Sequence, residues 1–298
     1  MLQRTFSAQY QPCTLQYFAK HTEGDVTPFS MKHYYDRHWA EQYQGWESGS
    51  CRACGAWIDT MVKHVLTNTR NGAPLHRPGG YSNAQVIRFP AALGVYSHEG
   101  DLIRAAQEST RLTNHHQEPL LAAAFWARVA FRVVNGDSRS YQAIMEEAAD
   151  IMGNAFISTK LQQAVAKVQE ATDDAQPLSK EKFVDDLALT SMARLWDVGK
   201  SEPIKVGKAS PTEGTLPGAI YFILKYGKLA DAARANAMVG GDNASRAIPI
   251  GMVLGAREGL RGVPAHWTKQ LKQHSNATQL VQKLPLIQMA ANKEHSEL

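Results

Sequence analysis

The sequence predicts an all-α protein. Apolar residues recur at three- and four-residue spacing in residues 216–226 and 229–239, with Gly227 between them, which is typical of two helices joined by a turn. In residues 120–134, Ala and large apolar side chains lie all round the expected helix, as they do in a buried central helix. No segment indicates a convincing strand. We therefore expect the core to be built from packed helices.

The other helices are predicted from the same periodicity, interrupted by Pro- and Gly-rich segments. Thr27-Pro28 is typical of an N-cap followed by proline at the first helical position. The expected helices are 15–21, 28–43, 49–67, 82–96, 100–111, 138–152, 155–171, 179–196 and 271–289. Loops are expected at 68–81 and 197–211, and residues 290–298 are expected to form a frayed tail.

The composition is that of a soluble, folded protein. Hydrophobic residues make up 44% of the chain, which excludes a disordered protein, and 298 residues are enough to bury a substantial core. The net charge of +4 comes without a dense basic run, so we expect no nucleic-acid partner. The chain shows no long apolar segment and no signal-peptide core, so we expect no membrane partner and a cytoplasmic location.

Cysteines and aromatic residues in the N-terminal part allow two interpretations each. Cys51 and Cys54 have the spacing of a redox pair or of half a zinc site, but no second pair accompanies them, and ordinary core or near-surface thiols are favoured. The aromatic and basic side chains of residues 28–43 are able to stack on bases, but core packing against a neighbouring helix is favoured.

A helix is expected to begin just after Gly240 and Gly241, because Pro249 is best tolerated close to a helix start. Free backbone N–H groups and the positive end of the helix dipole favour an anionic ligand at such a place. Asp242 and Ser245 also offer oxygens to a hard cation. The simpler alternative is that one of these two residues only caps the helix.

Small residues are expected to let another helix approach this one closely. Ala247, Gly251, Gly255 and Gly259 fall four apart, so on a helix they form one face with almost no side chain. Because Gly weakens a helix interior by roughly 1 kcal/mol relative to Ala, several on one face indicate tight packing.

Two adjacent histidines, His115 and His116, suggest a metal pair at first sight. Neighbouring helical residues point about 100° apart, and zinc sites favour spacings of three or four, so the two histidines are not expected to bind one ion. One is expected to be structural and the other to lie near a ligand cleft.

An ordered set of segments near the C-terminus resembles the signature of the ADP-ribosylglycohydrolase family, which also includes J-type crystallins. The segments are Thr215-Leu-Pro-Gly-Ala-Ile-Tyr, then 232–242, Gly255-Ala256 and 263–267, with a weaker resemblance in 82–93 and 112–136. The resemblance implies a single orthogonal multi-helix bundle over residues 1–298. Residues 1–80 match weakly, and 215–267 form the signature.

The resemblance also implies a function. Active members hydrolyse the glycosidic bond of ADP-ribosyl groups with two Mg²⁺ ions, held by a Thr-Asp-Asp triplet and an Asp-x-Asp-Thr or -Ser set. Asp242 and Ser245 match the second set as metal ligands, with Ala244 in place of its second Asp. The segment 11–13 (Gln-Pro-Cys) stands at the triplet and supplies no carboxylate. The implied substrate cleft contains His115, Gly240, Gly241 and Asn243.

Two functions are therefore carried forward. The first is a Mg²⁺-dependent hydrolase of ADP-ribosyl or related nucleotide-sugar linkages, with catalysis impaired or lost and Mg²⁺ binding weakened or lost, as in a pseudoenzyme or in a chain that lacks N-terminal residues. The alternative is a non-catalytic, crystallin-like structural or ligand-binding relative. The expected partner is an ADP-ribose-like small molecule.

Overall fold

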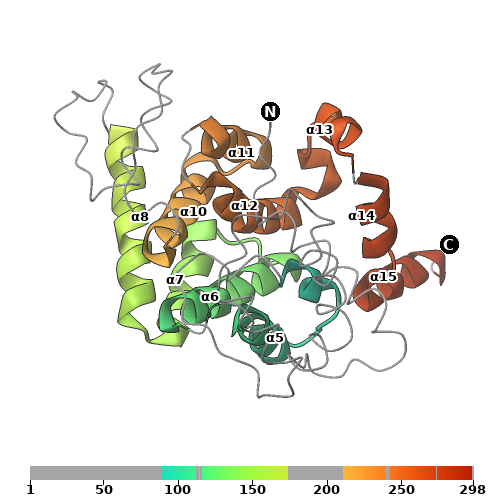
Figure 1. The fold of residues 1–298 in the computed structure, drawn as a ribbon, viewed down its shortest axis with the longest axis horizontal. Helices are drawn as coiled ribbons and strands as arrows, with labels where there is room; N and C mark the ends of the chain where they lie inside the picture. The colour runs from blue at the N-terminus through green and yellow to red at the C-terminus, as the bar shows by residue number, and fades with distance from the viewer. Residues whose placement is uncertain are drawn as a thin grey trace, which may run out of the picture. The chain divides into compact units, whose positions relative to one another are not determined.

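The computed structural model describes residues 89–111, 114, 116–173, 211–238, 242–272 and 274–296. All regular elements in these ranges are helical and none is a β-strand, which confirms the predicted all-α class (Figure 1). The chain divides into two compact units, whose described residues are 89–127 with 269–296, and 128–268. The prediction of one domain over residues 1–298 stays a prediction.

The first unit contains a buried aromatic pair. Phe125 and Trp126 on α6 are fully buried, and their rings meet edge to face with centroids 5.1 Å apart. Close to η4, Leu284 is 4% exposed, and its Cδ1 is 2.5 Å from where a Cβ at Gly94 would lie. The elements are η4 (Pro90–Gly94), α5 (Glu99–Arg111), the start of α6 (Gln117–Val134), α14 (His274–Val281) and α15 (Pro285–Ser296).

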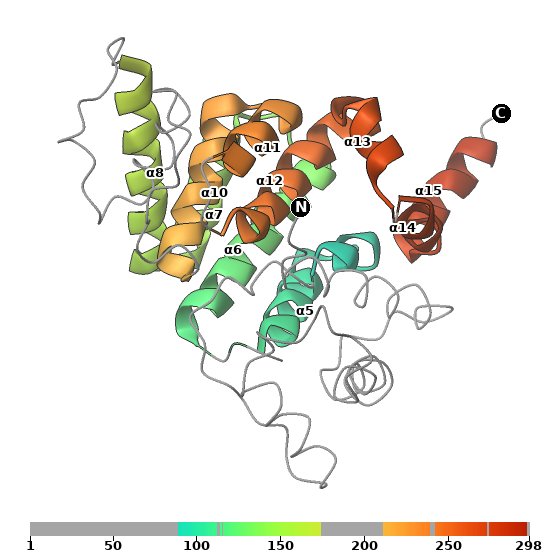
Figure 2. The ribbon, with the colours of Figure 1, turned by 45° about the horizontal axis from the view of Figure 1, so that its top comes forward.

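The second unit is organised around α10 (Thr212–Tyr226). This helix packs against α8, α11 and α12, and it lies beside α8 in both views (Figures 1 and 2). The reason is its composition, since every residue from 215 to 223 is buried and nearly all are apolar or small. The other elements of the unit are α7 (Tyr141–Met152), α8 (Ala155–Asp173), α11 (Leu229–Met238), α12 (Asn243–Glu258), η6 (Gly259–Gly262) and most of α13 (Ala265–Gln270).

Helix ends in the second unit follow capping chemistry. The hydroxyl of Ser140 accepts a hydrogen bond from the backbone N–H of Ala143 at the start of α7. Gly227 ends α10 with φ 64°, a left-handed conformation that glycine adopts without strain. The turn predicted between the helices 216–226 and 229–239 is thereby confirmed.

Proline and glycine in α12 behave differently from the prediction. Pro249 lies well inside the helix, not in its first turn, so the carbonyl of Ser245 receives no amide hydrogen bond from that position. The expected close approach along the glycine face is also wrong for the described residues. There, a Cβ at Gly251 would meet nothing within 4 Å, and one at Gly255 would meet only Leu229, at 3.9 Å.

Two expected helices differ in detail from the structure. The segment expected as one helix over 271–289 forms α14 and α15, because Pro285 starts a new helix at the position where its missing N–H forfeits no bond. The end of the expected helix 82–96 is the 3₁₀ helix η4, again begun by a proline, Pro90. The structure follows α15 to Ser296, and fraying of the tail stays a prediction.

Several predictions lie outside the described residues. They are the helices 15–21, 28–43, 49–67 and 179–196, residues 82–88 of the helix 82–96, the loop 68–81, residues 197–210 of the loop 197–211, the cysteines Cys51 and Cys54, and the segment 11–13. Among the residues that the structure does describe, no helix is both long and apolar enough to cross a membrane.

Candidate functional site

The start of α12 has the local geometry that the sequence predicts. Asp242 is the N-cap, and its side-chain oxygen accepts a hydrogen bond from the backbone N–H of Ser245 at 3.2 Å. An oxygen in this position satisfies a donor that has no partner within the helix. Capping is therefore one thing that this carboxylate does. The metal role of Asp242 and of Ser245, which is 2% exposed, stays a prediction.

Two asparagines join the end of α11 to the start of α12. The side-chain amide of Asn236 donates to the carbonyl oxygen of Asn243 at 2.7 Å. In return, the side-chain amide of Asn243 donates to the carbonyl oxygen of Ala237 at 3.3 Å. The side-chain amide of the cleft candidate Asn243 thus donates a hydrogen bond within the protein. Its contact with a substrate stays a prediction.

The remaining cleft candidates, His115, Gly240 and Gly241, lie outside the described residues. Their neighbour His116 is described, and its Nδ1 accepts a hydrogen bond of 3.4 Å from the backbone N–H of Glu118, at the start of α6. This bond is a local contact at the start of α6, and the division of structural and cleft roles between the two histidines stays a prediction. Of the predicted site residues, the structure brings together Asp242, Asn243 and Ser245.

A buried arginine, which the sequence analysis did not single out, completes this region. Arg246 is 0% exposed, its Nε donates to Oδ1 of Asn236 at 2.8 Å, and its guanidinium carbon lies 6.0 Å from the ring centroid of Phe222. Burial lowers the pKa of Arg246 to about 10, while the nearby charge of Asp242 raises it. Arg246 is therefore a cation at neutral pH.

A signal for this arginine was present in the sequence. Arg246 shares a helix face with Ile250 and Val253, which are both fully buried. A charged residue on the apolar face of an amphipathic helix is an exception that helical periodicity makes visible. Such exceptions require a compensating partner in the fold.

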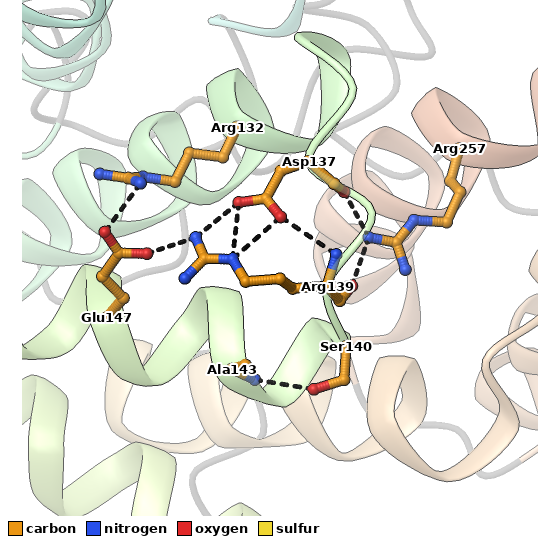
Figure 3. A network of polar contacts seen from close by, with 7 residues as sticks. All are labelled: Arg132, Asp137, Arg139, Ser140, Ala143, Glu147 and Arg257. Atoms are coloured by element: carbon orange, nitrogen blue, oxygen red, sulfur yellow. Dashed lines mark hydrogen bonds and ion pairs between the residues drawn. The ribbon is translucent and has the colours of Figure 1, made fainter.

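The other end of α12 is anchored by a polar network (Figure 3). One guanidinium nitrogen of Arg257 donates to the carbonyl oxygens of Asp137 and Arg139, both at 2.9 Å. The same guanidinium lies 4.0 Å from the ring centroid of Tyr141. Arg257 thus fixes the end of α12 to the segment that connects α6 with α7.

Ion pairs hold that connecting segment in place. Arg139 forms ion pairs with Asp137, at 2.6 Å, and with Glu147 (Figure 3). Glu147 also forms an ion pair with Arg132, at 2.9 Å. The side-chain hydrogen bond from Arg139 lowers the pKa of Asp137 to about 2, and the same bond raises the pKa of Arg139. Burial raises the pKa of Tyr141.

The donor set at the start of α12 fits a magnesium ion poorly. Mg²⁺ requires a near-octahedral shell of oxygens and usually rests on one or two carboxylates. Here Asp242 is engaged as a cap, position 244 is an alanine, and the cationic Arg246 lies in the next turn. The described residues contain no group of three or more His, Cys, Asp or Glu side chains placed to share a metal ion.

Comparison with known proteins assigns the family. The family model described as ADP-ribosylglycohydrolase matches residues 5–295. The chain belongs to the ADP-ribosylglycohydrolase family. A solved structure described as an "ADP-ribosylglycohydrolase-related protein complex" resembles it with a TM-score of 0.62 and 18% identity, over 95% of this chain and 81% of that chain. At that identity, the likeness shows a shared fold. No curated protein matches the sequence.

Membership of the ADP-ribosylglycohydrolase family confirms the resemblance drawn from residues 215–267. The resemblance implies that active ADP-ribosylglycohydrolases depend on metal ions. Ala244 and the buried Arg246 lie in the segment to which the resemblance assigns the second metal set.

Proposed function

We propose that this member of the ADP-ribosylglycohydrolase family recognises an ADP-ribose-like nucleotide sugar and that its Mg²⁺-dependent hydrolysis is impaired or lost. Membership of the family supports the ligand class. One observation carries the loss of hydrolysis: the Asp242 carboxylate caps α12 at 3.2 Å, and the next ligand position, Ala244, has no side-chain oxygen.

The chemistry of the family explains why this observation matters. Two bound metal ions orient a sugar and polarise a water, and each ion needs several oxygen ligands to do so. At the start of α12 a single carboxylate remains, and the helix already uses one of its oxygens. Backbone N–H groups at a helix start still favour an anionic group such as a diphosphate.

The test combines binding with turnover. ADP-ribose is titrated calorimetrically into the full chain, once with Mg²⁺ and once with a chelator, and release of ADP-ribose from an ADP-ribosylated protein is followed in parallel. We expect the same binding heat in both buffers and no release above that of a heat-inactivated sample. Release that requires Mg²⁺ contradicts the proposed loss of hydrolysis.

Asp242 variants sharpen the experiment. Asp242→Asn keeps an oxygen that caps α12 but removes the carboxylate charge, whereas Asp242→Ala removes both. If binding is independent of a metal on Asp242, the Asn variant binds ADP-ribose as the unmodified chain does. Weaker binding by Asp242→Ala alone then reports disturbance of the helix start.

A crystallin-like structural role is the second candidate. It is favoured by the internal use of the site's polar groups, since Asp242 caps a helix and the Asn243 amide bonds the carbonyl of Ala237. A folded protein that gives no heat with ADP-ribose, with or without Mg²⁺, supports this second function.

A further inference from the structure

We propose that the guanidinium of Arg246 takes the place of a bound cation at the start of α12. The proposal rests on the position of this side chain. A positive charge is unfavourable there for two reasons. Arg246 lies near the N-terminal end of the helix, where the helix dipole repels cations, and it is 0% exposed, so its charge has been removed from water.

The surroundings of Arg246 compensate for this position. Its Nε donates to Oδ1 of Asn236 at 2.8 Å, and Asn236 is itself 2% exposed. The ring of Phe222 lies beside the guanidinium, and the Asp242 carboxylate supplies the nearby negative charge. A buried charge with a hydrogen-bond acceptor, an aromatic ring and an acidic neighbour is a built feature of the fold.

The helix opposite is shaped to admit this side chain. A Cβ at Gly218 on α10 would lie 2.8 Å from Cδ of Arg246, so a larger residue at position 218 would collide with the arginine. The glycine that matters for packing in this region is therefore Gly218 on α10, not a glycine on α12. The absence of a side chain at Gly218 therefore leaves the space that the Arg246 side chain occupies.

Charge explains why the arginine replaces a metal. A cation in this region would balance Asp242. Arg246 supplies a positive charge one helical turn away, where its backbone N–H donates to the carbonyl oxygen of Asp242 at 3.3 Å. A divalent ion would then be repelled by the guanidinium and would gain no oxygen from position 244, which is Ala. The site therefore keeps a cation without keeping a metal ion.

The experiment is a double-mutant cycle on the unfolding of the full chain. Asp242→Asn keeps the cap without the charge, and Arg246→Met keeps an apolar stem without the guanidinium. If Arg246 is the cation that balances Asp242, the unfolding constant of the double variant differs from the product of the single effects by at least about threefold. Simple additivity overturns the proposal.

A second measurement addresses the metal directly. We expect millimolar Mg²⁺ and a chelator to leave the thermal midpoint of the unmodified chain unchanged. A Mg²⁺-dependent rise that disappears in Asp242→Asn overturns the proposal. If Arg246→Met does not fold, the cycle is run with Arg246→Gln, which removes the positive charge but keeps a side-chain N–H group for Asn236. The same coupling to Asp242 is then expected, and additivity again contradicts the proposal. Because these readouts measure unfolding, they do not depend on whether ADP-ribose binds.

Discussion

Arg246 on α12 lies against Gly218 on α10, with its Cδ 2.8 Å from the position that a Cβ at residue 218 would occupy. Phe222, one turn further along α10, faces the guanidinium at 6.0 Å. Gly218 and Phe222 of α10 therefore lie against the buried side chain of Arg246 on α12. This contact is next to the start of α12, where the family resemblance places a metal ligand, Asp242. This contact leads to the first prediction.

Gly218→Ala should destabilise the protein by about 1–3 kcal/mol, because the added methyl group forces a fully buried arginine to move. Gly251→Ala on α12 is the matched control. No other part of the described residues comes within 4 Å of the place where a Cβ at Gly251 would lie. Ala should therefore raise stability by about 0.5–1 kcal/mol through its higher helix propensity. Chemical denaturation measures both, and equal effects at the two glycines would show that Gly218 has no steric role.

Asp242→Ala should lower stability by about 1 kcal/mol, since the first turn of α12 loses the oxygen that accepts the N–H of Ser245. Asp231→Ala, at an exposed position in the first turn of α11, should stay within about 0.5 kcal/mol of the unmodified chain. The free energy of unfolding from denaturant titration separates the two variants. A loss at Asp231 as large as that at Asp242 would argue against a specific capping role.

Arg257→Ala should destabilise the protein by about 1–2 kcal/mol, because two carbonyl acceptors lose a charged donor and Tyr141 loses a guanidinium over its ring. Arg261→Ala, an exposed arginine of η6, is the control for removal of a positive charge nearby. Thermal unfolding of the pair provides the measurement. Indistinguishable midpoints would mean that the anchor of α12 lies elsewhere.

Stability should fall in acid through Asp137. The pKa of this carboxyl is lowered from 3.8 to about 2 in the folded protein, so its contribution to stability is complete above pH 3.8 and disappears as the pH falls towards 2. Asp137→Asn should remove this part of the pH dependence. Arg139→Gln should remove it as well, since the hydrogen bond from Arg139 is the main cause of the shift. Denaturant titrations between pH 4 and 2 test this, and unchanged slopes in both variants would refute it.

Much of the fold was accessible from the sequence. The spacing of apolar residues, and the Gly and Pro residues that interrupt it, predicted the helices around residues 100–171 and 212–258 to within a few residues. Asp242 was also correctly placed at a helix start. These features depend on neighbours three or four residues apart. The same reasoning wrongly predicted that another helix packs closely on the glycine face of α12. Residue spacing within one helix does not show which neighbour a face contacts.

The candidate site was accessible only in part. The residue types at positions 242 and 245 indicated either a cap or a cation site, and the cap was found. The interaction of Arg246 with Asn236 depends on how α11 packs on α12. Its contact with α10 depends on Gly218, which is 28 residues away in the sequence. Spacing within one helix carries no information on such contacts.

The sequence by itself determined the all-α class, most helix boundaries, the capped start of α12 and, through an ordered fifty-residue resemblance, the ADP-ribosylglycohydrolase family. Only the tertiary structure decided that the guanidinium of Arg246 is buried with Asn236 as its acceptor, and that Gly218 leaves room for this side chain. The physical reason is that helix formation and capping act between residues close in the chain. Burial of a charge is instead settled by which distant helices exclude water from it and supply its partners.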